Sequence, residues 1–199
     1  TIASATGKVG NARDLESSSS QYFMKALNSS LQFAGDVTVG MWFKPESINT
    51  AQVLLDFSGT GGYRFRMGTT GTLQFSVDDG SALTSVYWGT DLATGSWYYI
   101  LGWHDDVNNK IYIQINNGTA VSAAFTGTMA VPTGNLYLGQ SGDAAAYTDG
   151  IIDEAFIARR IYTDDERSWF WNGGAGRRYT DLITPQGVTG VFLSDYGVI

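Results

Sequence analysis

Carboxylates dominate the residues of this chain that could take part in acid–base chemistry. The chain has 199 residues, with 19 Asp and Glu, one histidine and no cysteine. Only four of the acids are glutamates: Glu16, Glu46, Glu154 and Glu166. Glycoside hydrolysis needs two carboxylates that face each other across about 5–9.5 Å, and no glutamate pair has the spacing on one strand that would build this. Adjacent Asp153 and Glu154 should point to opposite faces of a strand. We therefore expect a protein that is not an enzyme.

The single histidine, His104, would have to serve any Ser-His-Asp site or zinc site. One histidine without cysteine does not supply a zinc ligand set. We interpret His104 as a surface or hydrogen-bonded residue at the end of an aromatic strand. An oxygen-only site for a hard cation such as calcium suits the acidic composition better.

Sugar binding requires exposed aromatic rings beside Asp, Asn or Gly. Three stretches have this composition: the turn-rich segment 81–95, the loop 105–109, and the segment before a strand near residue 150. The candidate ligand-binding residues are Tyr87, Trp88, Asp105, Asn108, Tyr147 and Asp149. Two alternatives stay open, because Trp88 could alternate into the core with Trp42, Trp97 and Trp103, and because Asp149 could form a turn with Gly150.

The net charge of −7 and the pI of about 4.5 restrict the partners. An acidic surface disfavours nucleic acid and anionic membrane. No run of about 18 apolar residues is present, so we expect no membrane insertion. A carbohydrate or a protein surface is the partner class that remains.

Short alternating segments separated by turn residues recur along the chain and predict an all-β fold. The expected strands are 37–43, 51–57, 63–67, 73–77, 97–103, 111–115, 119–125, 136–139 and 151–158. One short helix should begin after Thr163, because Thr163 and Glu166 have the spacing of a capping box, and should end near Trp171. The pattern predicts a two-sheet antiparallel jelly-roll sandwich with one helix near the C-terminus.

The last residues differ from the rest in composition. Residues 184–199 are apolar, contain several glycines and carry one charge, Asp195. We therefore divide the chain into a jelly-roll domain at 1–183 and a C-terminal strand or arm at 184–199. An exposed apolar arm would be a liability, so it could mediate a homo-oligomer or a larger assembly.

An ordered set of motifs resembles the laminin G-like, or concanavalin A-like lectin/glucanase, jelly-roll family. The motifs are GKVGNA at 7–12, VTVGMWFKP at 37–45, GSWYY at 95–99, LYLG at 136–139, DGIIDEAFI at 149–157, and the helix 163–171 with its trailing NGG. The resemblance implies the sandwich fold over about residues 7–180.

The resemblance also implies a calcium site between the early loop and the last long strand. The matching aspartate is Asp153, and its partner segment is Glu16 to Ser20, where Glu16 stands in place of the usual Asp-Gly. The family includes lectin-like modules, adhesion modules and structural domains, so fold alone does not choose between them. We expect a non-catalytic module that binds glycan or a surface ligand in an extracellular or virion-surface setting. The alternatives are a structural or assembly subunit with no small ligand, for example a viral capsid decoration or tail component, and, third, a glycoside hydrolase.

Overall fold

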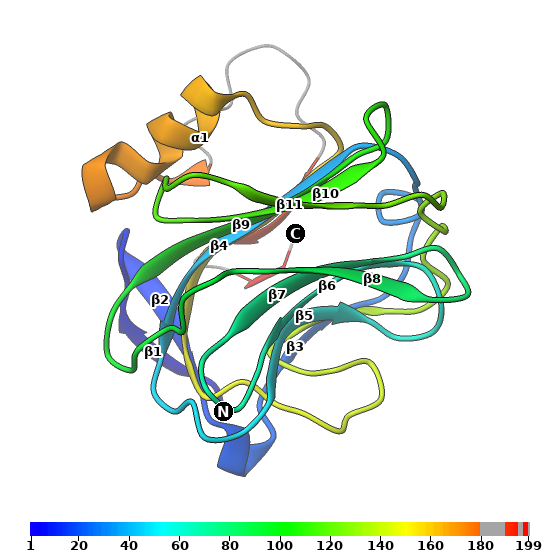
Figure 1. The fold of residues 1–199 in the computed structure, drawn as a ribbon. Coiled ribbons are helices and arrows are strands. Elements are labelled where there is room, and N and C mark those ends of the chain that lie inside the picture. Colours follow the sequence, from blue (N-terminus) through cyan, green and yellow to red (C-terminus); the bar gives the residue numbers. More distant parts are fainter. Residues whose placement is uncertain (180–189, 195–196, 199) are drawn as a thin grey trace.

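A computed structural model describes residues 1–179, 190–194 and 197–198 of the chain. Two antiparallel sheets face each other, and one short helix lies on the outside of one of them (Figure 1). The expected two-sheet jelly-roll sandwich is therefore confirmed. No helix in the described part of the chain is long and apolar enough to cross a membrane.

The larger sheet carries the helix on its outer face. Its strands follow the order β1-β2-β13-β4-β9-β10-β11. Their bounds are β1 Ala3–Thr6, β2 Asn11–Leu15, β13 Gly150–Ala158, β4 Val37–Pro45, β9 Tyr98–Asp105, β10 Lys110–Ile115 and β11 Val121–Ala124. β4 and β9 pair over seven residues each, from Val37 opposite His104 to Phe43 opposite Tyr98.

The smaller sheet has the order β3-β12-β5-β6-β7-β8. Its strands are β3 Phe23–Lys25, β12 Leu136–Leu138, β5 Gln52–Phe57, β6 Gly62–Met67, β7 Leu73–Asp78 and β8 Leu83–Tyr87. Sequence patterning did not predict β3 and β8 as strands. β8 lies in the segment 81–95 that we interpreted as turn-rich, and it pairs with β7 from Leu83 opposite Asp78 to Tyr87 opposite Gln74.

The inner faces of both sheets close on one apolar core. Strand alternation sends Ile111, Ile113 and Ile115 of β10 inward, where they are buried with the rings of Phe65 and Phe75. Gly102 of β9 makes room for these rings, because a Cβ at that position would lie 2.4 Å from Phe75. Burial of large apolar side chains at about 1.5–3 kcal/mol each makes this core the main source of stability.

His104 lies on the inner face of β9 and is fully buried, so it is not a surface residue. Its Nδ1 is 2.8 Å from the carbonyl oxygen of Gly35, and its ring meets Phe125 edge-on. These contacts bring no catalytic group to His104. Of the two interpretations, a surface residue or a hydrogen-bonded structural residue, the second is the one that fits His104.

A second apolar cluster lies on the outer face of the larger sheet, under the helix α1, Asp164–Trp171. Rings from the sheet and from the helix stack on one another there. The buried members are Trp42, Tyr99, Leu101, Trp103, Phe156, Ala158, Tyr162, Phe170 and Tyr179. Trp42 and Trp103 are thus buried as expected, but outside the sandwich rather than between its sheets, and Trp97 is only half-buried.

The C-terminal backbone returns to the larger sheet. Strand β14, Gly190–Ser194, pairs antiparallel with β13, and β15, Gly197–Val198, pairs with β14. β2 and β14 pair with the same edge of β13: β2 with residues 150–152 and β14 with residues 156–158. The proposed boundary between residues 183 and 184 lies outside the described residues.

Candidate functional site

Strands β9 and β10 present a row of large side chains on the outer face of the sheet. Because side chains alternate along a strand, Tyr112 and Gln114 point outward while the isoleucines between and around them point inward. Tyr112 lies opposite Trp103 in the register, and their rings stack with centroids 4.8 Å apart and planes 8° apart. This row forms the floor of an open groove.

The helix α1 provides one wall of the groove, and its first turn is fixed by a capping box. The Thr163 hydroxyl accepts a hydrogen bond from the Glu166 backbone N–H at 3.3 Å, and the Glu166 carboxylate accepts one from the Thr163 N–H at 2.8 Å. The expected start of the helix is therefore confirmed. Such caps stabilise a helix by about 1 kcal/mol.

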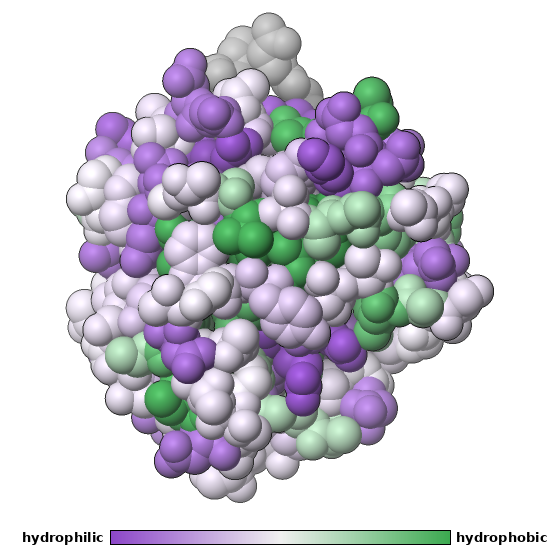
Figure 2. All heavy atoms as spheres, in the orientation of Figure 1, coloured by the Kyte–Doolittle hydropathy of each residue, from purple (hydrophilic) through white to green (hydrophobic). Residues whose placement is uncertain are grey.

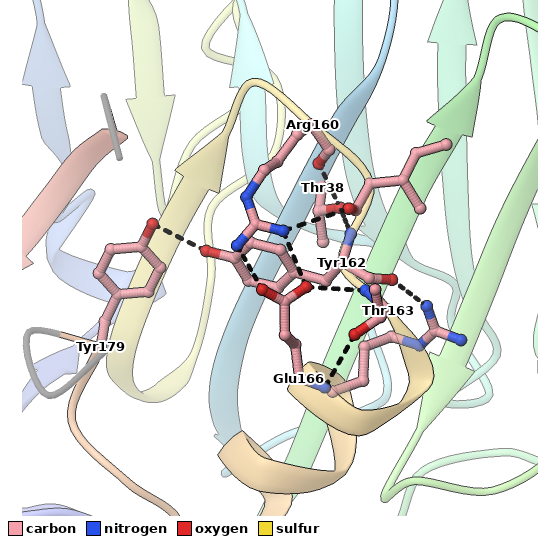
Figure 3. Close-up of polar contacts among 8 residues, drawn as sticks. Thr38, Arg160, Tyr162, Thr163, Glu166 and Tyr179 are labelled. Atoms are coloured by element: carbon pink, nitrogen blue, oxygen red, sulfur yellow. Dashed lines mark hydrogen bonds and ion pairs between the residues drawn. The ribbon is translucent and has the colours of Figure 1, made fainter. Parts of the chain in front are cut away.

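Further polar contacts attach this helix start to the sheet (Figure 3). Arg160 donates two hydrogen bonds to the Glu166 carboxylate, at 2.8 and 2.6 Å, and stacks on the Tyr162 ring at 4.3 Å. This bidentate pair lowers the pKa of Glu166. The Thr38 hydroxyl of β4 donates to the Arg160 carbonyl at 2.8 Å and accepts from the Tyr162 N–H at 3.1 Å. The groove wall is therefore held by the sheet itself.

The Tyr162 hydroxyl extends this network into the outer cluster. It donates a 2.8 Å hydrogen bond to the hydroxyl of Tyr179, and both rings are buried. Burial raises the pKa of both phenols. Both hydroxyls therefore stay protonated at neutral pH, and their contribution is structural.

The groove between α1 and β10 has a volume of about 830 Å³. Ligand sites of globular proteins span about 300–1,000 Å³, so its size suits a small ligand or part of a chain. Its lining is Trp103, Asp105, Tyr112, Gln114, Asn117, Gly118, Thr119, Ala120, Ile161, Tyr162, Thr163, Asp164, Asp165, Arg167 and Ser168. Hydrophilic side chains gather over α1 and over the β9–β10 loop, near the upper corners of the view in Figure 2.

Two nearly buried polar side chains in the groove keep unused hydrogen-bonding capacity. Gln114 is 7% exposed; its Nε2 donates to the Gly118 carbonyl at 2.7 Å, and its Oε1 has no partner among the described residues. Arg167 is 8% exposed, lies 4.4 Å over the Trp103 ring, and donates to the Tyr162 carbonyl and Asp164. Its Nε has no partner in the described part of the chain. Unpaired buried polar groups are costly, and both atoms are closed to solvent, so these two side chains shape the groove from beneath its surface.

A second cavity of about 240 Å³ lies against β5, β6 and β7. Its lining includes Asp56, Arg64, Asp78 and Asp143, and burial raises the pKa of Asp56. Its volume falls below the range of ligand sites. It presents no stacked pair of rings among its lining residues, so we regard the groove as the better candidate.

Of the sequence-predicted residues, Tyr87 and Trp88 lie at the end of β8 in the other sheet. Tyr87 is 55% exposed, whereas Trp88 is half-buried and packs on the inner core. Trp88 also comes close to the β10–β11 turn, since a Cβ on Gly118 would lie 3.4 Å from its ring. Tyr87 stacks on no other ring within the described residues, and neither Tyr87 nor Trp88 lines the groove.

Asp105 and Asn108 are brought together in the β9–β10 loop. The Asp105 carboxylate accepts hydrogen bonds from the Asn108 backbone N–H at 3.0 Å and from its Nδ2 at 2.8 Å. Asp105 lines one end of the groove, whereas Asn108 is absent from its lining. The pair shapes that end of the groove.

Tyr147 and Asp149 lie just before β13, away from the groove. Tyr147 forms an isolated bridge with Gln140. Asp149 Oδ1 accepts hydrogen bonds from the N–H and hydroxyl of Ser17, at 3.3 and 3.2 Å. The Asp149 N–H donates to Gln52 Oε1 at 2.9 Å. These contacts hold the N-terminal segment to the start of β13.

Asp153, the expected metal ligand, is buried and engages the backbone. Its Oδ2 accepts from the Val9 N–H at 2.8 Å, and its Oδ1 accepts from the Glu154 N–H at 2.9 Å. Glu154 has φ of 45° within a β-bulge of β13, and its carboxylate accepts from the Tyr179 N–H at 2.7 Å. The expectation that Asp153 and Glu154 point to opposite faces was therefore wrong, because the bulge inserts an extra residue. Both carboxylates serve backbone donors.

Glu16, the other expected ligand, lies in a cluster of exposed and half-exposed acids. One carboxylate oxygen from each of Asp14, Glu16 and Glu46 lies within 4.8 Å of the others. Desolvation, followed by repulsion from these acids and from Asp149, raises the pKa of Glu46. Carboxylate oxygens are the ligand type that calcium takes, and this cluster supplies three of the six to eight oxygens that calcium binds.

Sequence reasoning did not identify Tyr112, Gln114 and Arg167 as site residues. Tyr112 and Gln114 occupy alternate positions of a strand that was recognised, so their shared face could have been inferred. Arg167 could not be placed, because nothing in the sequence sets where α1 packs on the sheet. The available signal was the alternation of isoleucines with Tyr112 and Gln114 along residues 111–115.

Comparison with solved structures yields the same architecture at low sequence identity. A heptameric SAP-like pentraxin from Limulus polyphemus is 16% identical, with a TM-score of 0.60 over 89% of this chain and 86% of that chain. Domain 4 of AbnA, a GH43 extracellular arabinanase from Geobacillus stearothermophilus, solved with arabinotriose, is 20% identical, with a TM-score of 0.67 over 89% and 82%. At these identities the likeness shows the fold alone.

Binding domains recur among the similar structures. The binding domain of Paraclostridial Mosquitocidal Protein 1 is 14% identical, with a TM-score of 0.70, and matches 87% of this chain but 46% of that one. No curated protein sequence matches the chain. A family model does, over residues 17–166, and its description is the concanavalin A-like lectin/glucanases superfamily. Because this match covers most of the chain, the protein belongs to the concanavalin A-like lectin/glucanase superfamily.

Proposed function

We propose that the protein is a non-catalytic carbohydrate-binding module that holds an oligosaccharide in the groove between α1 and β10. The observation that carries this proposal is the half-exposed Tyr112 ring, held parallel to the buried Trp103 ring on the groove floor. Aromatic faces bind the apolar faces of sugars, and amides and carboxylates bind hydroxyls. The six residues of β10 span about 20 Å at ~3.3 Å per residue. The groove therefore suits a stretch of several sugars.

The comparisons support this class of function without naming a ligand. One similar domain was solved with arabinotriose, and others are receptor-binding or binding domains of toxins. Catalysis is disfavoured because Asp153 and Glu154 are engaged with backbone donors. An extracellular or virion-surface location accords with a binding module of this superfamily.

A pair of tyrosine variants tests the proposed site. Affinity electrophoresis in gels that contain soluble polysaccharides would compare the wild type with Tyr112→Ala and Tyr87→Ala. We expect Tyr112→Ala to abolish retardation, since a central tyrosine in a binding site commonly contributes about 2 kcal/mol or more. Tyr87→Ala, which removes the equally large ring at the β8 end, should retain it. Unchanged binding by Tyr112→Ala would refute the groove.

We further propose a structural calcium ion held by Asp14, Glu16 and Glu46, rather than by Asp153. The raised pKa of Glu46 indicates that its charge is unfavourable in the folded protein. Stability from this group is present at low pH and is lost as pH rises through the folded pKa. Glu46→Gln should therefore raise the Tm in chelator at neutral pH and remove any Tm increase on adding calcium. A wild-type Tm unaffected by calcium would contradict the site.

Assembly through residues 184–199 remains the alternative function, with the chain as a structural subunit. β14 pairs with β13 of the same chain, so residues 190–194 extend the protein's own sheet. Light scattering on the full chain and on a version truncated after Asp181 distinguishes the two. A multimer that becomes a folded monomer on truncation favours the assembly function.

A further inference from the structure

The charges that line the groove are unbalanced. Asp105, Asp164 and Asp165 face one cation, Arg167. The Arg167 guanidinium is already committed, because it pairs with Asp164, donates to the Tyr162 carbonyl and lies over Trp103. An anionic ligand would therefore meet net negative charge and find no exposed cation among the described lining residues.

The start of α1 offers no replacement for that missing cation. Helix N-termini attract anions through free N–H groups and the helix dipole. Here the Glu166 N–H is bound by the Thr163 hydroxyl, and three acids, Asp164, Asp165 and Glu166, occupy the first turn. These acids already satisfy the positive end of the dipole. The helix start therefore repels a second anion.

The same wall leaves a carboxylate available to a cation. Asp165 is exposed, and no side-chain hydrogen bond or ion pair involves it within the described residues. Asp105, on the sheet side of the groove, uses its oxygens on Asn108, but each oxygen can accept a further donor. Both sides of the groove can therefore receive an ammonium or hydroxyl donor.

We infer that the groove selects glycans by charge, in the order amine-bearing, then neutral, then carboxylated or sulfated. This inference rests on the proposed function, since it names the ligand class of the same groove. Attraction and repulsion at a solvated site are modest and screened by salt. The preference should therefore be strongest at low ionic strength and should weaken as salt is added.

A glycan array tests the order directly, with several backbones each present in neutral, 2-amino and 6-carboxylate form. At low salt we expect the 2-amino form of the bound backbone to exceed its carboxylate form by about tenfold. Asp165→Asn should reduce this ratio severalfold, with the ratio taken within each variant so that a change common to all forms cancels. Asp91→Asn, the matched control, removes the same charge on an exposed residue outside the groove lining and should leave the ratio unchanged.

The outcomes separate the two proposals. Binding that requires Tyr112 but is equal or tighter for carboxylate forms would overturn the charge order alone. An amine-to-carboxylate ratio that Asp165→Asn leaves unchanged would also overturn it. Binding to no glycan, or binding that persists in Tyr112→Ala, would overturn the proposed function, and the charge order with it.

Discussion

The two faces of strand β10 carry different side chains and are covered in different ways. Inward, Ile111, Ile113 and Ile115 meet the second sheet and are buried along their whole length. Outward, Gln114 is nearly buried but Tyr112 stays half-exposed, because a single eight-residue helix lies over that face. The second sheet covers the whole inner face and buries it. The short helix buries only the part of the outer face beneath it and leaves a groove beside it.

The outer cluster therefore both attaches the helix α1 to the sheet and borders the groove, whereas the inner core only holds the two sheets together. Its buried rings, such as Phe156 and Phe170, attach α1 to the sheet with centroids 5.6 Å apart. Its margin, at the half-exposed Tyr112 ring, remains within reach of a ligand. Stability should depend most on the inner core, and binding most on the outer margin.

The largest expected effect on stability comes from opening the inner core. Phe75→Ala removes a fully buried ring that contacts Phe65 and Tyr63. Such truncations cost about 3–5 kcal/mol, a large share of the 5–15 kcal/mol that stabilises a typical domain. Urea unfolding measures the change. A loss below about 1 kcal/mol would show that the inner core is not dominant.

Phe170→Ala tests the outer cluster in the same way. Its ring is buried and stacks on Phe156, Tyr162 and Tyr179. We expect a loss near the lower end of the range, about 3 kcal/mol, because one helix can relax more readily than two sheets. Hydrogen exchange should rise mainly at 162–171. If the same loss of stability came with faster hydrogen exchange throughout both sheets, the two clusters would not be distinct.

The helix cap should contribute less, and in a pH-dependent way. Glu166→Gln weakens the pair with Arg160 and should cost about 1 kcal/mol at pH 7. The pKa of Glu166 is lowered in the folded state, so its contribution is present above the ordinary value of 4.5 and is lost as pH falls through the lower folded pKa. Wild type and variant should therefore converge in acid. Parallel stability curves across pH 3–7 would contradict this assignment.

The smallest effect on stability is expected at the groove floor. Gln114→Leu removes one hydrogen bond, to the Gly118 carbonyl, together with an unpaired oxygen. These two changes oppose each other, so the loss should stay within about 1 kcal/mol. Ligand affinity, measured by calorimetry, should fall severalfold, because the amide holds Gly118 at the edge of the groove. A large stability loss with unchanged affinity would make Gln114 a structural residue.

Local sequence patterns predicted most of the fold because the alternation of apolar and polar residues shows which positions of a strand face the core. The capping box of Thr163 and Glu166 similarly predicted the start of α1. β8 escaped prediction because Ser, Thr and Leu at 83–85 lack strong alternation, and its pairing with β7 supplies what propensity does not.

The site was harder to predict because it depends on contacts between distant segments. The bulge at Glu154 reverses an argument based on simple alternation. Asp105 was selected from its loop composition and does line the groove, but Arg167 reaches Trp103 only through helix packing. Glu16 was chosen by resemblance, whereas its neighbours are Asp14, near the end of the strand β2 that Glu16 follows, and Glu46, which directly follows β4.

The most direct test of the groove is hydrogen exchange of the full chain with and without the best-binding oligosaccharide. We expect the oligosaccharide to slow hydrogen exchange mainly at residues 116–120 and 161–168, which form the two sides of the groove. Protection at 83–92 instead would move the site to Tyr87 and Trp88. That result would contradict the claim that the partly covered outer face of β10 is the binding surface.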